Sequence, residues 1–264
     1  MRVGVFDSGL GGLTIIQAIT KIFKGAEIFY IADTKFAPYG EKTQEQILQH
    51  SLDIVDYLLK THQIDALIVA CNTATSAAIK ELRERFPSLI VIGTEPGIKP
   101  AIEATLSGKV GVMATPATLN GNKYQLLADE LSCSNSVELI EQACPGLVEQ
   151  IENGKTKEDK TVSMLHDWLK PMHENEVDTI VLGCTHYPLV SDTIKEIMGA
   201  HVKLIETGCA IAQRLKALSE EQGHTNNGHL EINVFSTGKI NKNMINEILE
   251  NWKDGGEIMV RSND

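Results

Sequence analysis

The chain has 264 residues, of which 42% are hydrophobic and 22% charged, so its composition is that of a globular protein and not of a disordered one. Its 24 Lys and Arg residues face 35 Asp and Glu residues, giving a net charge of −11, and no segment resembles the basic patch of a nucleic-acid-binding module. The longest apolar runs, residues 66–71 and 179–184, are too short to cross a bilayer and no leader precedes the first strand pattern, so we expect a cytoplasmic protein without nucleic-acid or membrane partners.

Short strands and helices alternate along the first third of the chain. Residues 3–6, 27–32, 66–70 and 89–93 are typical of buried strands, each bounded by Gly, Pro or small polar residues. Residues 43–46 (TQEQ) match a capping box and predict the start of a helix that continues through Leu59. A second helix is expected between Cys71 and Pro87. This alternation predicts a parallel sheet covered on both faces.

The pattern of the first half returns in the second. Residues 3–6 (VGVF) recur as 110–113 (VGVM), 64–71 (IDALIVAC) recur as 177–184 (VDTIVLGC), and 79–82 (IKEL) recur as 194–197 (IKEI). Either two buried strand–helix units look alike by chance, or the chain contains two similar α/β halves, about 1–97 and 98–206. In the second case, each half presents a cysteine at the end of an equivalent strand.

The last part of the chain, 207–264, shows a helix pattern at 210–218, a polar turn at 223–228, a strand at 230–235, another helix and a final strand. We expect this tail to pack on the first half. The predicted fold is therefore α/β, with two similar parallel-sheet domains related by a pseudo-twofold axis and a cleft between them. The first domain would comprise residues 1–97 plus 207–264, and the second residues 98–206.

The five cysteines, Cys71, Cys133, Cys144, Cys184 and Cys209, include no C-x-x-C pair, so we expect reduced thiols. Neither they nor the eight histidines form the close pairs of a zinc site, and no metal is expected. Two of them, Cys71 and Cys184, end strands before helix patterns, where backbone N–H groups favour an anion and lower a thiol pKa. The alternative for each is a buried, inert thiol.

Two thiols on opposite sides of one ligand suit inversion of a stereocentre. A thiolate removes the α-proton of an amino acid, and the opposite thiol returns a proton to the other face without metal or pyridoxal phosphate. Asp7, His186 and Glu152 are the titratable residues that could tune these thiols. From the pattern alone, Asp7 could equally be a helix N-cap, His186 an exposed residue and Glu152 part of a solvated helix face.

A nucleotide site is the main rival interpretation. Residues 9–14 (GLGGLT) follow a strand, and Asp33 ends the next strand where a ribose-binding acid is expected. However, Thr14 stands where the dinucleotide motif has Gly or Ala, and Gly12 interrupts the spacing. The motif of a P-loop does not occur in the sequence.

Several motifs together resemble the glutamate racemases of the aspartate/glutamate racemase superfamily. They are residues 7–12 (DSGLGG), 33–34 (DT) with 38–40 (PYG), 70–74 (ACNTA) and 183–188 (GCTHYP), and residues 114–118 (ATPAT) and 143–145 (ACP) look like further parts of the pattern. The match covers most of residues 1–208 in the right order. The resemblance implies a cofactor-independent, cytoplasmic, homodimeric enzyme that interconverts L- and D-glutamate for bacterial peptidoglycan.

The resemblance also implies roles for individual residues. Cys71 would deprotonate D-glutamate with help from Asp7, and Cys184 would deprotonate L-glutamate with help from His186 and Glu152. Substrate would be held at Asp7, Ser8, Tyr39, Gly40, Asn72, Thr73, Thr115, Thr118, Thr185 and His186. Residues 146–150 depart from the family pattern, which leaves Glu149 as an alternative to Glu152.

Three other functions remain open at this point. Aspartate or another acidic amino acid could be the substrate, because one methylene is worth only ~1–3 kcal/mol of discrimination. A non-catalytic relative could use the same cleft to bind a small ligand, although it would have no need of the second cysteine. A pyridoxal-dependent enzyme is the third.

Overall fold

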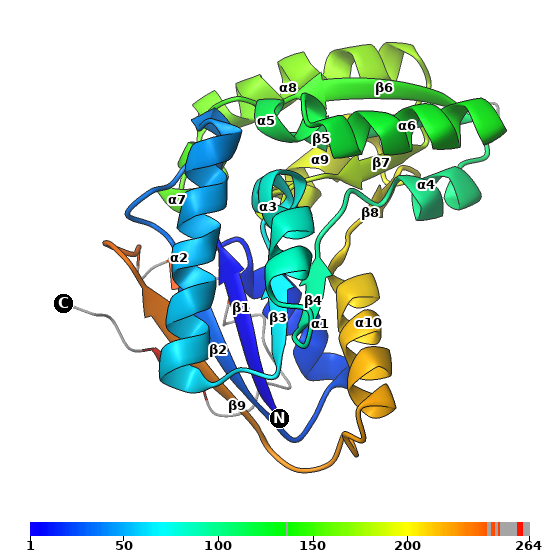
Figure 1. Ribbon diagram of the computed structural model, residues 1–264. Helices are drawn as coiled ribbons and strands as arrows, with labels where there is room; N and C mark the ends of the chain where they lie inside the picture. Colours follow the sequence, from blue (N-terminus) through cyan, green and yellow to red (C-terminus); the bar gives the residue numbers. More distant parts are fainter. Residues whose placement is uncertain (136, 242–243, 246–247, 249–257, 261–264) are drawn as a thin grey trace.

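The structure is a computed structural model, and it describes residues 1–135, 137–241, 244–245, 248 and 258–260 (Figure 1). Within these residues the chain forms two parallel β-sheets flanked by helices, one below the other in Figure 1. The strand order is β10-β9-β2-β1-β3-β4 in the six-stranded sheet and β6-β5-β7-β8 in the four-stranded sheet. The predicted α/β class with two parallel sheets is confirmed.

The six-stranded sheet combines the start of the chain with its tail. Its strands are β1 (Arg2–Asp7), β2 (Ala26–Ala32), β3 (Ala66–Val69), β4 (Ile90–Gly93), β9 (Leu230–Ser236) and β10 (Ile258–Val260). Its helical elements are α1 (Leu13–Ile22), η1 (Tyr39–Glu41), α2 (Gln44–His62), α3 (Asn72–Arg85) and α10 (Gly208–Glu221). Strand β9 pairs with β2 along its whole length, so the tail returns to the first half.

Alternate residues of each strand face two different helix layers. Val3 and Val5 belong to the core that includes α1 and α10, whereas Phe6 belongs to the core that includes α2 and α3. Because both faces are covered, the strands are apolar almost throughout, and this is the pattern that predicted them. The capping box is also present, since the Thr43 side chain accepts from Gln46 N and the Gln46 side chain accepts from Thr43 N.

The four-stranded sheet comes from the middle of the chain. Its strands are β5 (Lys109–Ala114), β6 (Glu138–Ala143), β7 (Thr179–Leu182) and β8 (Lys203–Ile205). Its helical elements are α4 (Ile98–Ala104), α5 (Pro116–Leu119), α6 (Asn122–Asn135), α7 (Leu147–Glu152), α8 (Asp159–Glu174), η2 (Tyr187–Val190) and α9 (Ser191–Met198). The order β6-β5-β7-β8 repeats the order β2-β1-β3-β4, so the repeated sequence segments occupy equivalent strands.

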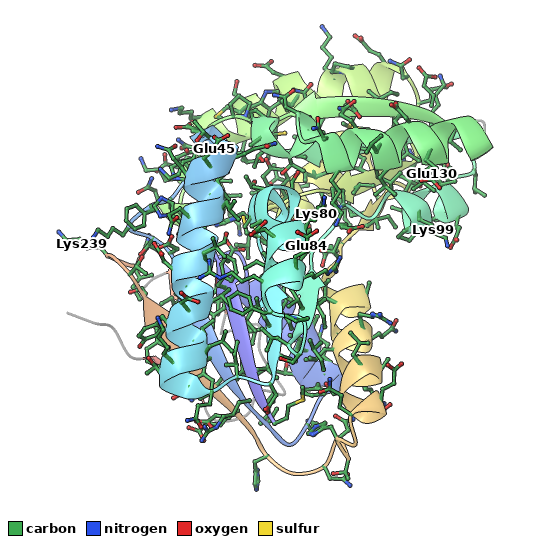
Figure 2. The ribbon with its side chains drawn as sticks, viewed as in Figure 1. Glu45, Lys80, Glu84, Lys99, Glu130 and Lys239 are labelled. Carbon is green, nitrogen blue, oxygen red and sulfur yellow. The ribbon has the colours of Figure 1, made fainter. Side chains whose placement is uncertain are left out.

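The repeated residues also serve equivalent purposes. A Cβ on Gly4 would lie 3.0 Å from Leu58 Cδ1 of α2, and a Cβ on Gly111 would lie 2.6 Å from Met172 Sδ of α8, so both glycines allow a helix to pack directly on a central strand. In the repeated helices, Ile79 is buried beside exposed Lys80, whose Nζ lies 3.9 Å from Glu84 Oε1 on the surface of α3 (Figure 2).

Two expectations need correction or restriction. The chain after Cys184 does not enter an α-helix directly, because a turn and the 3-10 helix η2 precede α9. The helix expected between β9 and β10 falls mostly outside the described residues. No helix in the described part of the chain is both long and apolar enough to cross a lipid bilayer.

Candidate active site

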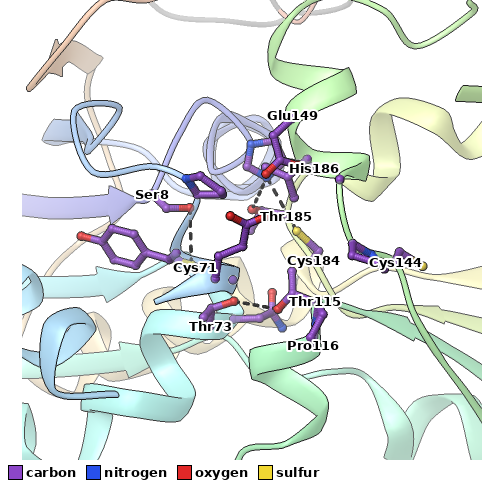
Figure 3. Close-up of a pocket in the computed structure, with 18 residues that line it drawn as sticks. Ser8, Cys71, Thr73, Thr115, Pro116, Cys144, Glu149, Cys184, Thr185 and His186 are labelled. Carbon is purple, nitrogen blue, oxygen red and sulfur yellow. Dashed lines mark hydrogen bonds between the residues drawn. The ribbon is translucent and has the colours of Figure 1, made fainter. Parts of the chain in front are cut away.

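A cavity of about 40 Å³ lies between the two sheets, where the carboxyl ends of their strands meet. Among its lining residues, Ser8, Tyr39, Gly40, Cys71, Asn72 and Thr73 come from the six-stranded part, and Thr115, Cys184, Thr185 and His186 come from the four-stranded part. Figure 3 shows Cys71 and Cys184 entering the cavity from different sheets.

Cys71 is the N-cap residue of α3. Its Sγ accepts a hydrogen bond from Ala74 N at 3.4 Å and lies 3.7 Å from Ser8 Oγ. Burial and the nearby Asp7 carboxylate outweigh these contacts and raise the pKa of the thiol to about 12. The expectation of a lowered pKa is therefore wrong for Cys71, because helix-start N–H groups do not compensate for loss of solvent and a neighbouring negative charge.

Cys184 lies in a different environment. It is followed by a turn, so the argument from the helix macrodipole does not apply to it. Its Sγ lies 3.7 Å from His186 Nδ1, and the same nitrogen lies 3.4 Å from Thr185 Oγ1 (Figure 3). The imidazole is thus the titratable group in direct contact with this thiol.

His186 is held from behind by Glu152. The Nε2 atom lies 2.5 Å from Glu152 Oε1, which also accepts from Leu10 N at 2.6 Å. Burial alone would lower the pKa of His186, but its hydrogen bonds to Cys184 and Glu152 and the Glu152 charge raise that pKa well above its usual value. Burial alone would raise the pKa of Glu152, yet contact with His186 lowers it. Neither residue is the exposed group that its alternative interpretation required.

Asp7 stands behind the cavity and not in its wall. Its carboxylate accepts from Gly9 N at 3.0 Å, Ser8 Oγ at 3.2 Å and Thr185 Oγ1 at 2.7 Å. The carboxyl is fully buried, and burial raises its pKa although His186 and Thr185 act in the opposite direction. The alternative interpretation as an N-cap is wrong, because Gly12 precedes α1 and no side chain caps that helix.

Part of the wall consists of neutral, buried polar groups. Three hydroxyls meet across the two sheets, with Thr73 Oγ1 at 3.0 Å from Thr115 Oγ1 and 3.3 Å from Thr118 Oγ1. Thr118 does not line the cavity but supports the other two. Both polar atoms of the Asn72 side chain are buried without a hydrogen-bond partner among the described residues, which leaves them available to a ligand.

The glycine run after β1 accommodates the His186–Glu152 pair. A Cβ on Gly9 would lie 2.1 Å from Glu152 Oε1, and a Cβ on Gly11 would lie 2.4 Å from His186 Nδ1. Side chains of the other half thus occupy the space that a pyrophosphate would need. Asp33 is bound as well, because Tyr39 Oη donates to Oδ2 at 2.5 Å and Thr237 Oγ1 donates to Oδ1 at 2.6 Å. The nucleotide interpretation finds no site here.

Some lining residues were missed from the sequence. Glu41, Gly146 and Val148 contribute to the wall, together with Glu149, which was considered only as an alternative to Glu152. The structure separates the two acids, since Glu152 contacts His186 while Glu149 faces the cavity. Glu41 and Gly146 could have been predicted from their position in the sequence, because they directly follow the 38–40 and 143–145 motifs.

Comparisons with known proteins agree with this geometry. A family model described as Asp/Glu/Hydantoin racemase matches residues 9–215. A glutamate racemase from Sulfurovum sp. (strain NBC37-1) is 63% identical over 252 residues, which are 96% of this chain and 95% of that protein. A glutamate racemase from Aliarcobacter butzleri (strain RM4018) is 64% identical over 251 residues, which are 95% of this chain and 96% of that protein.

Solved structures show the same arrangement of elements. A glutamate racemase isoform from Bacillus anthracis superposes with a TM-score of 0.84 at 32% identity, covering 100% of this chain and 97% of that one. The Escherichia coli glutamate racemase, crystallised with L-glutamate and the activator UDP-MurNAc-Ala, superposes with a TM-score of 0.83 at 29% identity, covering 99% and 97%. An aspartate racemase from Picrophilus torridus shares the fold, with a TM-score of 0.55 at 16% identity.

Proposed function

The chain belongs to the Asp/Glu/hydantoin racemase family, and from that premise we propose that it interconverts L- and D-glutamate by a two-base mechanism. The observation that carries the proposal is a pair of buried cysteines, Cys71 and Cys184, which come from two similar sheets and line one cavity. In the described lining there is no lysine that could form a Schiff base with a carbonyl cofactor. The reaction would therefore need only protein thiols.

In the direction from L- to D-glutamate, the thiolate of Cys184 takes the α-proton and the thiol of Cys71 gives its proton to the opposite face. One C–H bond breaks and another forms, and the stereocentre is inverted while the two sulfur atoms exchange protonation states. The raised pKa of Cys71 supports this direction, since it keeps that sulfur protonated before turnover. The reverse reaction uses the same groups with the roles exchanged.

The charged neighbours would each support one of the two cysteines. A protonated His186 beside Cys184 stabilises that thiolate, and Glu152 keeps the imidazole protonated. Asp7 would act on the other half-reaction, because its negative charge is among the causes that favour the protonated form of Cys71. Its bond from Thr185 also connects the first sheet to the wall beside Cys184.

The substrate would be held by neutral donors. Backbone N–H groups at the start of α3 and the hydroxyls of Thr73, Thr115 and Thr185 face the cavity, and the unpaired amide of Asn72 lies between them. These groups suit carboxylates, which the net charge of −11 would not attract from a distance. Tyr39, Gly40 and Ser8 would complete the binding site, and Thr118 would hold the hydroxyls of Thr73 and Thr115 in position.

Glutamate is preferred over aspartate because relatives above 60% identity over nearly the whole chain are named for glutamate. The deciding experiment follows the circular dichroism of L-glutamate and of L-aspartate with purified protein and no added cofactor. We expect the glutamate signal to decay to zero while the aspartate signal stays constant. Decay for aspartate would replace the substrate, and a constant signal for both would favour the non-catalytic binding protein.

Three further properties belong to the same proposal. The likeness to bacterial glutamate racemases supports a homodimer and a supply of D-glutamate for peptidoglycan, and sedimentation velocity tests the first of these.

We also propose domain boundaries at 1–97 plus 207–264 and at 98–206, because β9 of the tail pairs with β2 while β5 to β8 form their own sheet. Limited proteolysis that cuts first near 97 and 207 would support these boundaries.

A further inference from the structure

A second cavity, of about 230 Å³, lies beside the six-stranded sheet, between α2, the loop after β2 and the end of β9. It shares no lining residue with the cavity that holds the cysteines. Of the residues in the motifs that resemble the racemase family, Asp33 lines this cavity. Its volume is several times that of the cysteine cavity, so it can admit a small molecule without rearrangement.

Aromatic rings form much of the wall. Phe36 stacks on His50 with ring centroids 4.0 Å apart, and Phe235 and Tyr57 close the cavity from β9 and α2. Tyr57 is 42% exposed, which is unusual for a large side chain in this structure. A flat apolar ligand would cover this ring and gain the free energy of burying it.

The charge of the wall is negative. The lining includes the buried carboxylate of Asp33 and the exposed carboxylate of Asp53, which also accepts from Gln49 Nε2 at 2.8 Å, and no lysine or arginine lies among its described residues. Lys35 Nζ, outside the lining, lies 5.2 Å from the centroid of Phe36, within the distance of a cation–π contact.

We propose that this second cavity binds a small organic cation, an amine or amidine carried on a flat aromatic body. The aromatic walls would receive the flat body, and the Asp33 and Asp53 carboxylates would attract the positive group. The overall charge of −11 would raise the local concentration of such a cation and lower that of an anion.

A hydrogen bond between two side chains, Tyr39 and Asp33, connects the second cavity to the cysteine cavity. Asp33 lines the second cavity, and its Oδ2 accepts from Tyr39 Oη, while Tyr39 lines the first cavity. A cation that binds the Asp33 carboxylate competes with the Tyr39 hydroxyl for that carboxylate. We therefore expect an occupied second cavity to weaken substrate binding, so that the KM for glutamate rises; this step rests on the proposed function.

The test uses benzamidine as the probe, the full chain, and ligand-detected NMR titration. We expect saturable binding that Tyr57→Ala weakens about threefold to tenfold and that Tyr57→Phe preserves, because the ring provides the contact. Asp53→Asn should weaken binding by up to about fivefold. Asp56→Asn is the matched control, since Asp56 lies on the same helix but contacts Lys60 and Arg85 outside the cavity.

The binding result is independent of the reaction. Absence of saturable binding, or equal binding by the Tyr57→Ala variant, overturns the proposed site even if the protein racemises glutamate. Where binding is found, the KM for glutamate is measured at zero and at saturating benzamidine, and a twofold or larger rise is expected. An unchanged KM overturns the connection through Asp33. Failure of racemisation without benzamidine contradicts the proposed function and leaves the binding site standing.

Discussion

Cys71 and Cys184 occupy equivalent positions in the repeat, but the side chains around them differ. Cys71 has a carboxylate for its charged neighbour, and Cys184 has an imidazole whose pKa is raised. The negative neighbour disfavours the thiolate of Cys71, whereas the neighbour of Cys184 is an imidazole that Glu152 holds in place. The proposed mechanism uses this difference, with Cys71 giving a proton and Cys184 taking one in the direction from L- to D-glutamate.

Replacing one cysteine should separate the two half-reactions. Cys71→Ala keeps Cys184, so in D₂O it should exchange the α-proton of L-glutamate while racemisation falls roughly 10²–10⁴-fold. Cys184→Ala should do the same with D-glutamate. Proton NMR follows the exchange and circular dichroism follows the inversion. Cys209→Ala, at an exposed thiol outside the cysteine cavity, should behave as the unmodified protein. Exchange of both enantiomers by one single-cysteine variant would contradict the assignment.

Glu152→Gln should change the pH dependence of the reaction. Without the carboxylate, burial is the main influence on His186, so the pKa of the imidazole falls and its protonated form is lost at a lower pH. The kcat from L- to D-glutamate should fall about tenfold or more near neutral pH, and its alkaline limb should move to lower pH. A pH profile of initial rates measures both effects. Glu158→Gln is the control, at an exposed acid that pairs with Lys155. If Glu152→Gln gave the same pH profile as the unmodified protein, the role of Glu152 would be refuted.

At the scale of residues, the sequence predicted which side chains form the site better than it predicted their pKa values. Motifs indicated Cys71, Cys184 and His186, and all three line the cavity. The pKa of Cys71 was predicted in the wrong direction, because burial and the approach of Asp7 depend on how the strands pack. The link from Glu152 to His186 joins residues 34 positions apart in sequence, and no local pattern reports such a contact.

Single elements were predictable where one physical cause dominates. The capping box located the start of α2, and the apolar runs located the strands, because burial on both faces leaves little choice of residue type. The segment after Cys184 was harder, since Pro188 and the turn before it favour a 3-10 helix over direct entry into an α-helix. The repeated Asp in 64–71 and 177–184 has the same purpose in both halves, since Asp65 accepts from Arg2 N and Asp178 from Leu106 N.

Asp178→Asn should destabilise the turn that leads into β5. The carboxylate accepts from Thr105 Oγ1 at 2.6 Å, Leu106 N at 2.7 Å and Ser107 N at 2.8 Å. Partial burial alone would raise its pKa, but these bonds lower it from 3.8 to about 2. We expect a loss of about 1–3 kcal/mol in the free energy of unfolding at pH 7.

The pH dependence of this loss has a definite sign. Because the folded-state pKa is depressed, the stabilisation is present above about pH 4 and disappears as the pH falls through about 2. Urea unfolding at pH 7 and at low pH should therefore show a difference between the two proteins that shrinks on acidification. Asp167→Asn, at an exposed acid of α8, is the control. A difference that grows on acidification would contradict the prediction.

At the scale of the whole molecule, the glycine run after β1 is where His186 and Glu152 of the four-stranded part lie close to the first sheet. Gly11→Ala places a methyl group 2.4 Å from His186 Nδ1, so the buried ring has to shift. Because a shift of about 1 Å in a catalytic group costs on the order of 10²-fold, we expect kcat to fall at least tenfold with secondary structure intact. Racemisation assays and far-UV circular dichroism measure the two effects.

Gly108→Ala provides the contrast for this prediction. Gly108 has a φ of +73°, and no atom lies within 4 Å of the position that a methyl group would take, so alanine there strains a turn without crowding the site. That variant should lose stability and keep its kcat. Equal activity of Gly11→Ala and the unmodified protein would show that the glycine run does not determine where His186 lies.

The two sheets are similar, but the surroundings of the two thiols differ, and this difference has a kinetic consequence. Enantiomers have the same free energy in water, so the equilibrium constant of a racemase is unity and the Haldane relation requires equal kcat/KM in both directions. If the surroundings of Asp7 and His186 raise the kcat of one direction relative to the other, they must raise its KM by the same factor. The direction with the higher kcat therefore needs a higher substrate concentration to saturate. The arrangement of charges changes the rate of racemisation at a given concentration of each enantiomer, but it does not change the equilibrium mixture.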